Sequence, residues 1–379
     1  MIKEEKMRIG INARMFEKKQ LTGIARSVME ILRIWMKQYD ENEYYLFSNN
    51  ELSLEFAMPS NWHIVIQKCA VNKGIIWDEF ELPRLIKKYN IEVFWGTNFS
   101  LPPKVDGTKY YVTIYDLAAF KIKGVTERNN LIKLHLNVPR ACKRADKIIA
   151  ISKATARDIK DIFGIDEKKL EVSYCGGLSS DYAFSRNYDI TQINPILIFP
   201  EDYFLFIGTI EPRKNIITIV EAFETYLDNT SANTKLVLAG KIGWMCDNVL
   251  KKIKESKYSN NIILPGFISN SDKTYLLSNA KALVFPSLYE GFGIPILEAF
   301  AYGIPVLTSN ISSMPEVGGE AAFYIDNATD AIAFADLMKQ ISEYKREDLD
   351  ILKIKMHNQL KKFSWEKNAI EMMEIFKVE

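Results

Sequence analysis

The sequence predicts an α/β protein built from two doubly wound parallel sheets in succession. Short apolar runs alternate with longer segments of helical period along the whole chain, the pattern typical of parallel βαβ units. The chain has 379 residues, which is long for one compact core and sufficient for two α/β domains. The alternation breaks once, across residues 176–200, where Gly, Ser, Asn and Pro occur without a clear period. We therefore predict a domain linker in this segment.

Seven strands are expected in the first half and six in the second, with a domain boundary at about residue 190. Each domain should be Rossmann-like, with ligands bound beyond the carboxyl ends of its strands, and two such domains facing each other would form a cleft. The expected strands are Met7–Ala13, Tyr44–Ser48, His63–Gln67, Val93–Gly96, Tyr110–Leu117, Lys147–Ser152 and Leu170–Tyr174, then Tyr203–Thr209, Lys235–Gly240, Asn261–Pro265, Ala282–Ser287, Pro305–Asn310 and Ala322–Asp326.

The composition excludes several classes of protein. The four cysteines, Cys69, Cys142, Cys175 and Cys246, form no C-x-x-C pair, which argues against a disulfide framework or a zinc site and favours a reducing compartment. The residues Met1–Lys6 lead into a strand rather than into the apolar core of a signal peptide. No apolar run reaches the roughly 18 residues that a membrane span requires. We therefore expect a cytoplasmic protein.

The stretch Pro286–Glu298 carries the clearest functional pattern. A buried strand ends in a turn that presents Glu290, passes through Gly291–Gly293 and enters a helix at about Ile294. The glycines allow a ligand to approach the backbone, and amides at the start of a helix favour an anion or the oxygens of a sugar. Glu298 follows in the first turn of this helix, where complementing the helix dipole is the structural alternative.

A second pattern lies at Phe206–Asn215. An apolar strand runs into Gly208 and Thr209, and Arg213 and Lys214 follow just before a helix. Adjacent Arg and Lys at the carboxyl end of a strand suit a diphosphate, because Arg offers a planar fork of donors and Lys a compact charge. The alternative is a solvated turn with two ordinary surface charges.

Two further candidates lie in the first half. The strand Met7–Ala13 leads through a polar loop to Thr22 and Gly23, where a helix begins. Thr22 suits a helix cap, and Gly23 permits the close approach of a phosphate. The segment lacks G-x-G-x-x-G, so a dinucleotide fingerprint is not supported. A later strand delivers Tyr115 and Asp116 to the same edge of the sheet.

Several segments together resemble retaining glycosyltransferase family 4. They are the Glu290-x7-Glu298 spacing, the segment EPRKN at 211–215, SNISSMPEVGGEAA at Ser309–Ala322 and FSWEKNA at Phe363–Ala369. The resemblance covers nearly the whole chain and is nearest to bacterial mannosyltransferase-like members. It implies the GT-B fold, in which two Rossmann-like domains face an interdomain cleft. The first domain would then be residues 1–190 with a C-terminal helix at about 365–379, and the donor-binding domain residues 191–364.

The resemblance also implies a role for each matching residue. Arg213 and Lys214 would neutralise the donor diphosphate, Glu290 would lie beside the transferred sugar, and Glu298 would accept hydrogen bonds from the ribose hydroxyls. Gly23 would contact the donor phosphate from the opposite domain, and two backbone amides after Glu290 would hold sugar or phosphate oxygens. The donor-binding set is then Gly23, Gly208, Thr209, Gly291, Phe292, Gly293, Ile294 and Glu298.

Two departures from the family pattern affect the site. Tyr115 stands where members often have the histidine of H-D-L, and a tyrosine does not take up a proton near neutrality as an imidazole does. A hydrogen bond to the sugar or the acceptor is the role left to Tyr115 and Asp116. Thr209 stands where some relatives have an arginine, which leaves Arg213 and Lys214 to carry the charge at the diphosphate.

The expected chemistry is transfer of a hexose with retention of anomeric configuration. Breaking the anomeric C–O bond leaves positive charge on the sugar and negative charge on the diphosphate, which fixed cations stabilise. The family resemblance suggests substitution on one face, with Glu290 stabilising the sugar rather than forming a covalent bond. With Arg213 and Lys214 at the diphosphate, neither a metal nor a cofactor is expected. The one D-x-D match, Asp348–Asp350, lies in a late helical stretch.

The partners follow from the resemblance and from the charge distribution. GDP-mannose is the first expectation for the donor and UDP-glucose or a related donor the second, with a glycan or lipid-linked oligosaccharide as acceptor. Residues 1–190 carry a net charge of +6 and residues 191–379 a net charge of −5. The basic half favours peripheral contact with the inner face of a membrane, or a phosphorylated acceptor, and a solvated surface without a partner is the alternative. No basic stripe interleaved with aromatic residues indicates nucleic acid, and the sequence does not specify an oligomeric state.

Two other functions fit the same architecture. A nucleotide-sugar epimerase or hydrolase would need carboxylates and a histidine poised at the sugar ring, and Tyr115 in place of histidine does not favour it. A donor-binding subunit without catalysis would fit the departure at Tyr115, but the presence of Glu290, Arg213 and Lys214 argues against it.

Overall fold

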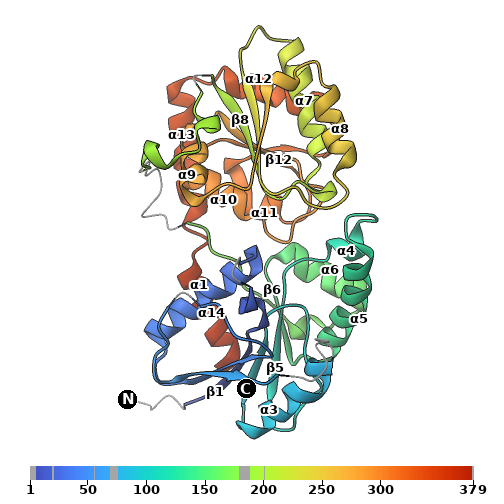
Figure 1. Cartoon of the computed structure of the whole chain (residues 1–379), viewed down its shortest axis with the longest axis vertical. Helices are drawn as coiled ribbons and strands as arrows, with labels where there is room; N and C mark the ends of the chain where they lie inside the picture. The colour runs from blue at the N-terminus through green and yellow to red at the C-terminus, as the bar shows by residue number, and fades with distance from the viewer. Residues whose placement is uncertain are drawn as a thin grey trace. The chain divides into compact units, whose positions relative to one another are not determined.

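The computed structural model describes residues 6–18, 21–54, 56–68, 76–178, 188–199 and 201–377. Cys69 and much of the predicted linker, residues 179–187 and 200, lie outside the described residues. The chain divides into two compact units, Met1–Lys121 with Arg128–Gly176 and Trp365–Glu379, and Ile122–Glu127 with Gly177–Ser364. Each unit contains one parallel sheet with helices on both faces, as the alternating pattern predicts (Figure 1).

The first unit has a seven-stranded parallel sheet in the order β3-β2-β1-β4-β5-β6-β7. Every strand predicted in the first half is present, with ends that differ by a few residues. The strands are β1 Arg8–Asn12, β2 Glu43–Ser48, β3 Trp62–Ile66, β4 Val93–Gly96, β5 Lys109–Ile114, β6 Lys147–Ala150 and β7 Leu170–Val172; the helices are α1 Gly23–Gln38, α3 Leu82–Lys88, α4 Ala118–Lys121, α5 Arg128–Arg144, α6 Lys153–Phe163 and α14 Trp365–Lys377.

The second unit has a six-stranded parallel sheet in the order β10-β9-β8-β11-β12-β13. Its strands again match the predicted positions. The strands are β8 Tyr203–Ile207, β9 Lys235–Ala239, β10 Ile262–Gly266, β11 Ala282–Phe285, β12 Val306–Ser309 and β13 Phe323–Ile325; the helices are α7 Ile216–Asp228, α8 Asp247–Glu255, α9 Asn270–Asn279, α10 Ile294–Ala301, α11 Met314–Gly318, α12 Ala331–Ser342 and α13 Arg346–Leu360.

The strand order reverses once in each sheet, between β1 and β4 in the first and between β8 and β11 in the second. Both units are therefore doubly wound, which confirms the predicted fold class. In open sheets of this kind, the loops that follow the two strands at the reversal diverge to opposite faces and leave a crevice between them. The segments after β8 and β11 are the two that carry the strongest sequence patterns.

The chain passes from the first unit to the second at Gly176 and Gly177. A Cβ on Gly176 would lie 2.3 Å from the backbone nitrogen of Trp365, at the start of α14. A Cβ on Gly177 would lie 2.9 Å from the Cβ of Leu297 in α10. The glycine pair therefore allows close packing on each side of the crossing.

This division falls earlier than the boundary predicted at about residue 190. Within residues 188–199, the backbone N–H of Asn194 donates to Asp272 at 2.8 Å, and the side chain of Leu197 is fully buried. These contacts attach the segment to the second unit. Its lack of helical or strand period reflects short 3-10 turns at Ile190–Gln192 and Pro195–Leu197.

The C-terminal helix α14 packs within the first unit. The indole N–H of Trp35 donates to the carbonyl oxygen of Ala369 at 2.9 Å, and the ring of Phe376 lies 4.6 Å from that of Tyr111 between centroids. Helix α14 contacts α1 along its length, and Figure 1 shows the two side by side. The last helix thus completes the core of the unit that the first residues begin.

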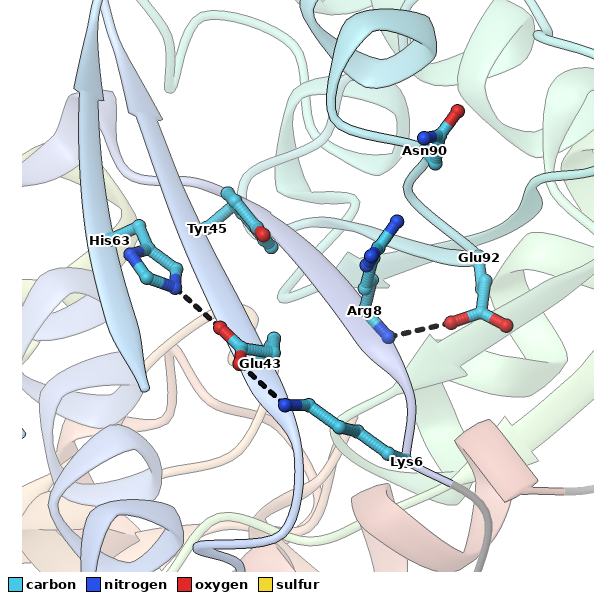
Figure 2. Close-up of a pocket in the computed structure, with 7 residues that line it drawn as sticks. All are labelled: Lys6, Arg8, Glu43, Tyr45, His63, Asn90 and Glu92. Atoms are coloured by element: carbon cyan, nitrogen blue, oxygen red, sulfur yellow. Dashed lines mark hydrogen bonds and ion pairs between the residues drawn. The ribbon is translucent and has the colours of Figure 1, made fainter. Parts of the chain in front are cut away.

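At the edge of the first sheet where its strands begin, seven side chains surround a hollow of about 570 Å³ (Figure 2). The carboxylate of Glu43 accepts a hydrogen bond from Lys6 at 2.6 Å and lies 2.5 Å from Nε2 of His63. Glu92 accepts from the backbone N–H of Arg8 at 2.8 Å. Charges of both signs pair with one another here, and the hollow contains none of the predicted site residues.

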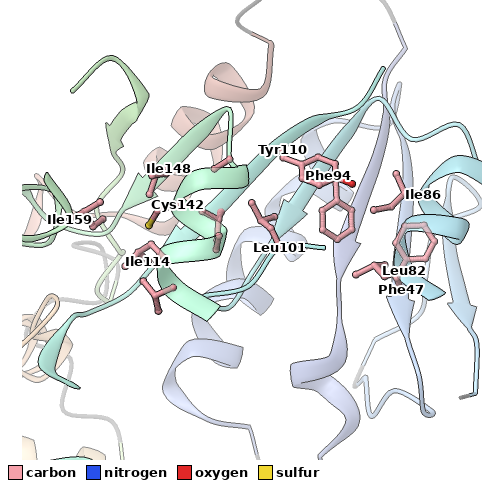
Figure 3. Packing of buried hydrophobic residues seen from close by; sticks show 14 of the residues in the cluster. Phe47, Leu82, Ile86, Phe94, Leu101, Tyr110, Ile114, Cys142, Ile148 and Ile159 are labelled. Carbon is pink, nitrogen blue, oxygen red and sulfur yellow. The ribbon is translucent and has the colours of Figure 1, made fainter. Parts of the chain in front are cut away.

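Helices cover one face of the first sheet and form an apolar core with it (Figure 3). Side chains from α3, α5 and α6 pack there against β4, β5 and β6. The tryptophans Trp35, Trp62, Trp77 and Trp95 are at most 5% exposed, so they are core residues. No helix in the described ranges combines the length and the apolarity that a membrane span requires.

Candidate active site

The loops after β8 and β11 bring Arg213, Lys214 and Glu290 into direct contact. Nη1 of Arg213 donates to Oε2 of Glu290 at 2.8 Å, and Nζ of Lys214 donates to Oε1 of the same carboxylate at 2.5 Å. The two strands are neighbours in the parallel sheet, so their carboxyl ends meet at one edge. This geometry brings together the residues that the sequence predicts as catalytic.

Glu211 is a member of this cluster that the sequence analysis did not assign. Its carboxylate accepts from Nε of Arg213 at 3.1 Å and lies 2.8 Å from Nη2. Arg213 also donates from Nη1 to the carbonyl oxygen of Tyr289 at 2.8 Å. Each nitrogen of the guanidinium therefore has a protein acceptor, and Arg213 links the two loops. In the sequence, the one indication that Glu211 belongs to the site is its position directly before Pro212-Arg213-Lys214. That segment resembles an ordinary surface turn.

The side chain of Lys214 makes fewer hydrogen bonds than that of Arg213. Its side chain is buried, and its ammonium lies 4.9 Å from the centroid of the Phe285 ring. Among the described residues, the one hydrogen-bond acceptor in contact with its ammonium is Glu290. An ammonium has three N–H donors, so Lys214 can bind a further anion without losing this contact.

The cluster is buried and its charges balance. Glu211, Glu290 and Lys214 are 4%, 7% and 8% exposed, so each group depends on its partners for solvation. Burial alone would raise the pKa of Glu290, but the charges of Arg213 and Lys214 outweigh it, and the pKa falls to about 2. Burial raises the pKa of Glu211 against the effect of Arg213. Glu290 is therefore a carboxylate at neutral pH, which excludes it as a proton donor there.

Two serines hold the turn that presents Glu290. The hydroxyl of Ser313 donates to the carbonyl oxygens of Glu290 and Phe292 at 2.9 and 2.7 Å, and the hydroxyl of Ser312 bonds the backbone of Glu290. Gly293 directly precedes α10 and has φ of +113°, a conformation that residues with side chains rarely adopt. In the sequence, the stretch Ser309–Ala322 indicates only a family resemblance. The structure shows that its serines hold the turn that presents Glu290.

Asn215 fastens the same two loops from the other side. It adopts a left-handed conformation with φ of +57°, directly before α7. Its side-chain amide donates to the carbonyl oxygen of Pro286 at 3.2 Å and to that of Ala328 at 2.6 Å. The asparagine of the EPRKN segment is thus structural, and it fixes the distance between the loops that carry Lys214 and Glu290.

The prediction that Glu298 lies in the first turn of its helix is wrong. Helix α10 begins at Ile294, and 3.6 residues per turn place Glu298 in the second turn, away from the dipole of the helix start. Its carboxylate instead forms an ion pair with Lys273 of α9, with side chains 17% and 26% exposed. An interaction with the helix dipole therefore does not explain the presence of Glu298.

Gly208 and Thr209 follow β8 next to the cluster. Gly208 has φ of +154°, and a Cβ at this position would lie 3.9 Å from Cε of Lys214. A Cβ on Gly240, at the end of β9, would lie 1.8 Å from the carbonyl oxygen of Gly208. The backbone after β8 is therefore closely packed between its neighbours, and Thr209 continues it towards Glu211.

The remaining candidates lie in the first unit. Gly23 is the first residue of α1, Thr22 caps the helix by accepting from the backbone of Ala25 at 3.3 Å, and a Cβ on Gly23 would meet nothing within 4 Å. Tyr115 follows β5 and is 7% exposed, and burial raises its pKa well above the ordinary value. Asp116 accepts from the backbone of Ala118 at 3.0 Å and so begins α4. These residues belong to a different unit from Glu290.

The acidic side chains of the described residues do not form a metal site. No group of three or more His, Cys, Asp and Glu side chains is arranged to hold a metal ion in that part of the chain. Asp348 accepts from the backbone of Lys345 at the start of α13, and Asp350 pairs with Lys353 at 3.0 Å. In the D-x-D match, Asp348 therefore caps the helix and Asp350 forms an ion pair within it.

Comparisons with known proteins identify the family and the fold. Residues 22–176 match the Glycosyltransferase Family 4 family, and residues 191–363 match Glycosyl transferases group 1. The chain is 28% identical over 295 residues to O-antigen chain mannosyltransferase B of Escherichia coli, which covers 77% of this chain and 76% of that protein. It is 30% identical over 249 residues to the serotype-specific mannosyltransferase WbdA of Escherichia coli, covering 63% of this chain but 30% of that longer protein.

Among solved structures, HepE of Anabaena in complex with UDP and glucose has a TM-score of 0.71 at 13% identity, covering 99% of this chain and 100% of that one. At this identity the likeness concerns the fold alone. The two doubly wound units have the GT-B fold, and the two family matches show that the chain is a glycosyltransferase. The chain belongs to glycosyltransferase family 4, with bacterial mannosyltransferases among its relatives.

Proposed function

We propose that this glycosyltransferase is a retaining enzyme that transfers mannose from GDP-mannose to a glycan or lipid-linked acceptor during polysaccharide biosynthesis. The observation that carries the proposal is the convergence of Glu290, Arg213 and Lys214 in one buried cluster at the carboxyl edge of the second sheet. Similarity to an O-antigen mannosyltransferase supports mannose as the sugar. The alternative donor, a UDP-linked hexose, is supported by the UDP and glucose bound to HepE.

The contacts divide the work between the two cations. Lys214 retains N–H donors for an added anion, so it would bind the diphosphate and stabilise the charge that develops on the leaving group. Arg213 already donates to Glu211, Glu290 and the carbonyl of Tyr289, so it would mainly fix the position of Glu290. This refines the sequence prediction, in which both cations neutralise the diphosphate directly.

The same contacts support retention by substitution on one face. Glu290 accepts hydrogen bonds from both cations, which reduces the nucleophilicity of its oxygens, so a covalent glycosyl–enzyme bond is disfavoured. A carboxylate whose pKa falls to about 2 is well suited to stabilise positive charge on the sugar ring. The leaving phosphate oxygen would then take the proton of the acceptor hydroxyl. These steps require neither a metal nor a cofactor.

Donor choice is tested by thermal unfolding of the protein with nucleotides and nucleotide-sugars. We expect GDP and GDP-mannose to raise the melting temperature more than UDP, dTDP or their sugars, because a ligand that binds only the folded state stabilises it by mass action, by about 2.7 kcal/mol at a hundred times its Kd. A larger shift with UDP and UDP-glucose would contradict the GDP assignment. The variant Lys214→Met should reduce the shift with the matching nucleotide, which ties binding to this site.

An epimerase on the same fold is disfavoured by the buried tyrosine in the first unit. Tyr115 is 7% exposed and its pKa is raised by burial, so it neither accepts nor releases a proton near neutral pH. Proton abstraction from a sugar carbon requires a base of suitable pKa at the ring. Glu290, held ionised by two cations, is too weak a base for that step.

A further inference from the structure

The turn that presents Glu290 packs against the end of helix α13. The ring of Phe363, three residues after the last residue of α13, meets the ring of Phe292 edge to face, with 5.5 Å between the ring centroids. Both side chains are buried, at 5% and 3% exposure. Helix α10, which follows the turn, packs against α13 as well (Figure 1). The end of α13 therefore supports the turn through an apolar contact.

This contact fixes the backbone directly after Glu290. An edge-to-face pair of aromatic rings is directional, so Phe363 determines the orientation of Phe292 as well as its burial. The carbonyl oxygen of Phe292 accepts from the hydroxyl of Ser313 at 2.7 Å. Gly293, the next residue, has φ of +113° and no side chain that could anchor the backbone. The ring of Phe292 is therefore the side-chain anchor at this end of the turn.

The same end of α13 also holds helix α11. Nε2 of Gln359 donates to the carbonyl oxygens of Glu316 and Val317, at 3.0 and 2.9 Å. Carbonyl groups in the last turn of a helix have no partner within the helix, so a buried helix end needs donors from elsewhere. Gln359 is 4% exposed, and a Cβ on Gly319 would lie 2.6 Å from its Oε1. The amide of Gln359 therefore caps α11 in a space that Gly319 leaves free.

Helix α11 begins directly after the two serines that bond the backbone of Glu290. Ser313 is the residue before its first turn, and the helix has only 5 residues. A helix this short is not stable by itself, so its position depends on packing and on the contacts at its ends. Gln359 is thus connected to Glu290 through α11 and Ser313, and Phe363 is connected to it through Phe292.

Phe363 is itself held in place, although it lies beyond the end of a helix. Its backbone N–H donates to the carbonyl oxygen of Leu360 at 3.0 Å, and its own carbonyl oxygen accepts from the backbone N–H of Gly177 at 3.4 Å. A Cβ on Gly177 would lie 2.9 Å from the Cβ of Leu297 in α10. The second unit ends at Ser364, so Phe363 lies directly before the chain returns to the first unit.

We propose that Gln359 and Phe363 are positioning residues for Glu290, each acting through the backbone of the turn that presents it. The inference rests on the proposed function, in which Glu290 stabilises charge on the transferred sugar. A displacement of about 1 Å in a reacting group can lower a rate by about 100-fold, so a support outside the charged cluster can affect turnover. The alternative is that the two residues stabilise the second unit as a whole without fixing this turn.

Hydrogen–deuterium exchange of the peptide that covers residues 286–298 separates these alternatives without any substrate. In the wild type, the backbone N–H of Glu290 donates to the hydroxyl of Ser312 at 3.2 Å. Phe363→Leu removes the aromatic edge, and Gln359→Leu leaves two buried carbonyl groups without their donor. We expect each variant to exchange this peptide about tenfold faster than the wild type, because the turn opens locally more often.

Phe334→Leu is the matched control. Phe334 is fully buried in the same unit, on α12, which packs against α7. We expect it to lower the melting temperature about as much as Phe363→Leu does, with exchange of the 286–298 peptide and kcat within about twofold of the wild type, because distant sites act independently. Equal acceleration of the peptide in Phe334→Leu would show that only overall stability matters and would overturn the inference.

Steady-state kinetics tests the consequence for the reaction. We expect Phe363→Leu to lower kcat by about 10- to 100-fold and to change the KM of the acceptor by no more than about threefold. The double variant F292L/F363L should have the kcat of Phe292→Leu, because Phe363 acts through Phe292. Additive losses in kcat would contradict this route.

Failure of the inference and failure of the proposed function give different results. Unchanged exchange of the 286–298 peptide in both Phe363→Leu and Gln359→Leu would overturn the inference, even if Glu290→Gln is inactive. A fully active Glu290→Gln would overturn the role of Glu290 in transfer, even if both variants exchange the peptide faster. Faster exchange in both variants, together with the loss of kcat in Phe363→Leu, is the result that the inference predicts.

Discussion

Replacing Glu290 with glutamine is expected to lower turnover by about two to three orders of magnitude, the range seen when a group that stabilises transition-state charge is removed. Glutamine keeps an acceptor oxygen for only one of the two cations, turns an NH2 group towards the other, and has no negative charge to stabilise the sugar ring. The variant should still fold, with a lower melting temperature, because two buried cations lose a counter-charge and Glu211 compensates only in part. Steady-state kinetics with a thermal melt measures both effects.

Glu211→Gln is the matched control for this variant. Its carboxylate also pairs with Arg213 and is buried to the same degree, so its loss destabilises the cluster similarly. The ion pair of the Glu211 carboxylate is with Arg213 and not with Lys214, so we expect turnover to fall only about tenfold, corresponding to about 1.4 kcal/mol in the barrier. If the two variants lost equal activity, Glu290 would be a structural member of the cluster and its assigned role would be wrong.

Because the pKa of Glu290 is lowered in the folded protein, the free energy of unfolding depends on pH in the acidic range. Its pKa in the folded protein, about 2, lies below the ordinary value of 4.5. The carboxylate therefore contributes stability that is present above about pH 4.5 and is lost as the pH falls towards 2. An acidic limb near neutral pH in the wild-type rate, absent from Glu290→Gln, would contradict an ionised Glu290.

Replacing Lys214 with methionine is expected to lower kcat by about two to three orders of magnitude. Methionine has a similar shape and can keep the packing on Phe285, so the fold should be preserved. The variant loses the one cation of the cluster that retains donors for a diphosphate. Glu290 remains paired with Arg213, so its charge is still balanced. Isothermal titration with the nucleoside diphosphate should show the loss in binding directly.

Lys273→Met provides the comparison for Lys214→Met. Both lysines form an ion pair with a glutamate of the Glu-x7-Glu spacing, Lys273 with Glu298 and Lys214 with Glu290. If Glu298 binds the ribose, Lys273→Met should raise KM and change kcat by no more than a few-fold. A large fall in kcat for Lys273→Met, with Lys214→Met nearly as active as the wild type, would reverse the assigned roles.

Much of the fold was predictable from the sequence, because local patterns determine it. Short apolar runs identified every strand of the described residues, since a strand buried on both faces reads as a continuous run. The unit boundary was less well predicted. Residues 188–199 lack period because they form isolated turns, and only long-range contacts such as Asn194 with Asp272 assign them to the second unit.

The candidate site was predictable to the extent that its residues lie at strand ends. Arg213, Lys214 and Glu290 were identified because parallel strands place their carboxyl ends at one edge. Glu211 and Ser313 were not identified. Glu211 pairs with Arg213, a nearby side chain whose direction no sequence pattern encodes. Ser313 bonds the backbone of Glu290, which lies far away in the sequence. The predicted helix start at Ile294 is confirmed, but Glu298 is the fifth residue of this helix and so lies in its second turn, not its first.

The central claim is that this site transfers a sugar with retention, and NMR of the reaction products tests it most directly. The protein is incubated with the donor that stabilises it most and with a glycan acceptor, and the one-bond carbon–proton coupling at the new anomeric centre is measured. Retention predicts the anomeric configuration of the donor, so an α-linked product from GDP-mannose. A β-linked product would contradict retention, and an isomerised nucleotide-sugar without any glycoside would contradict transfer.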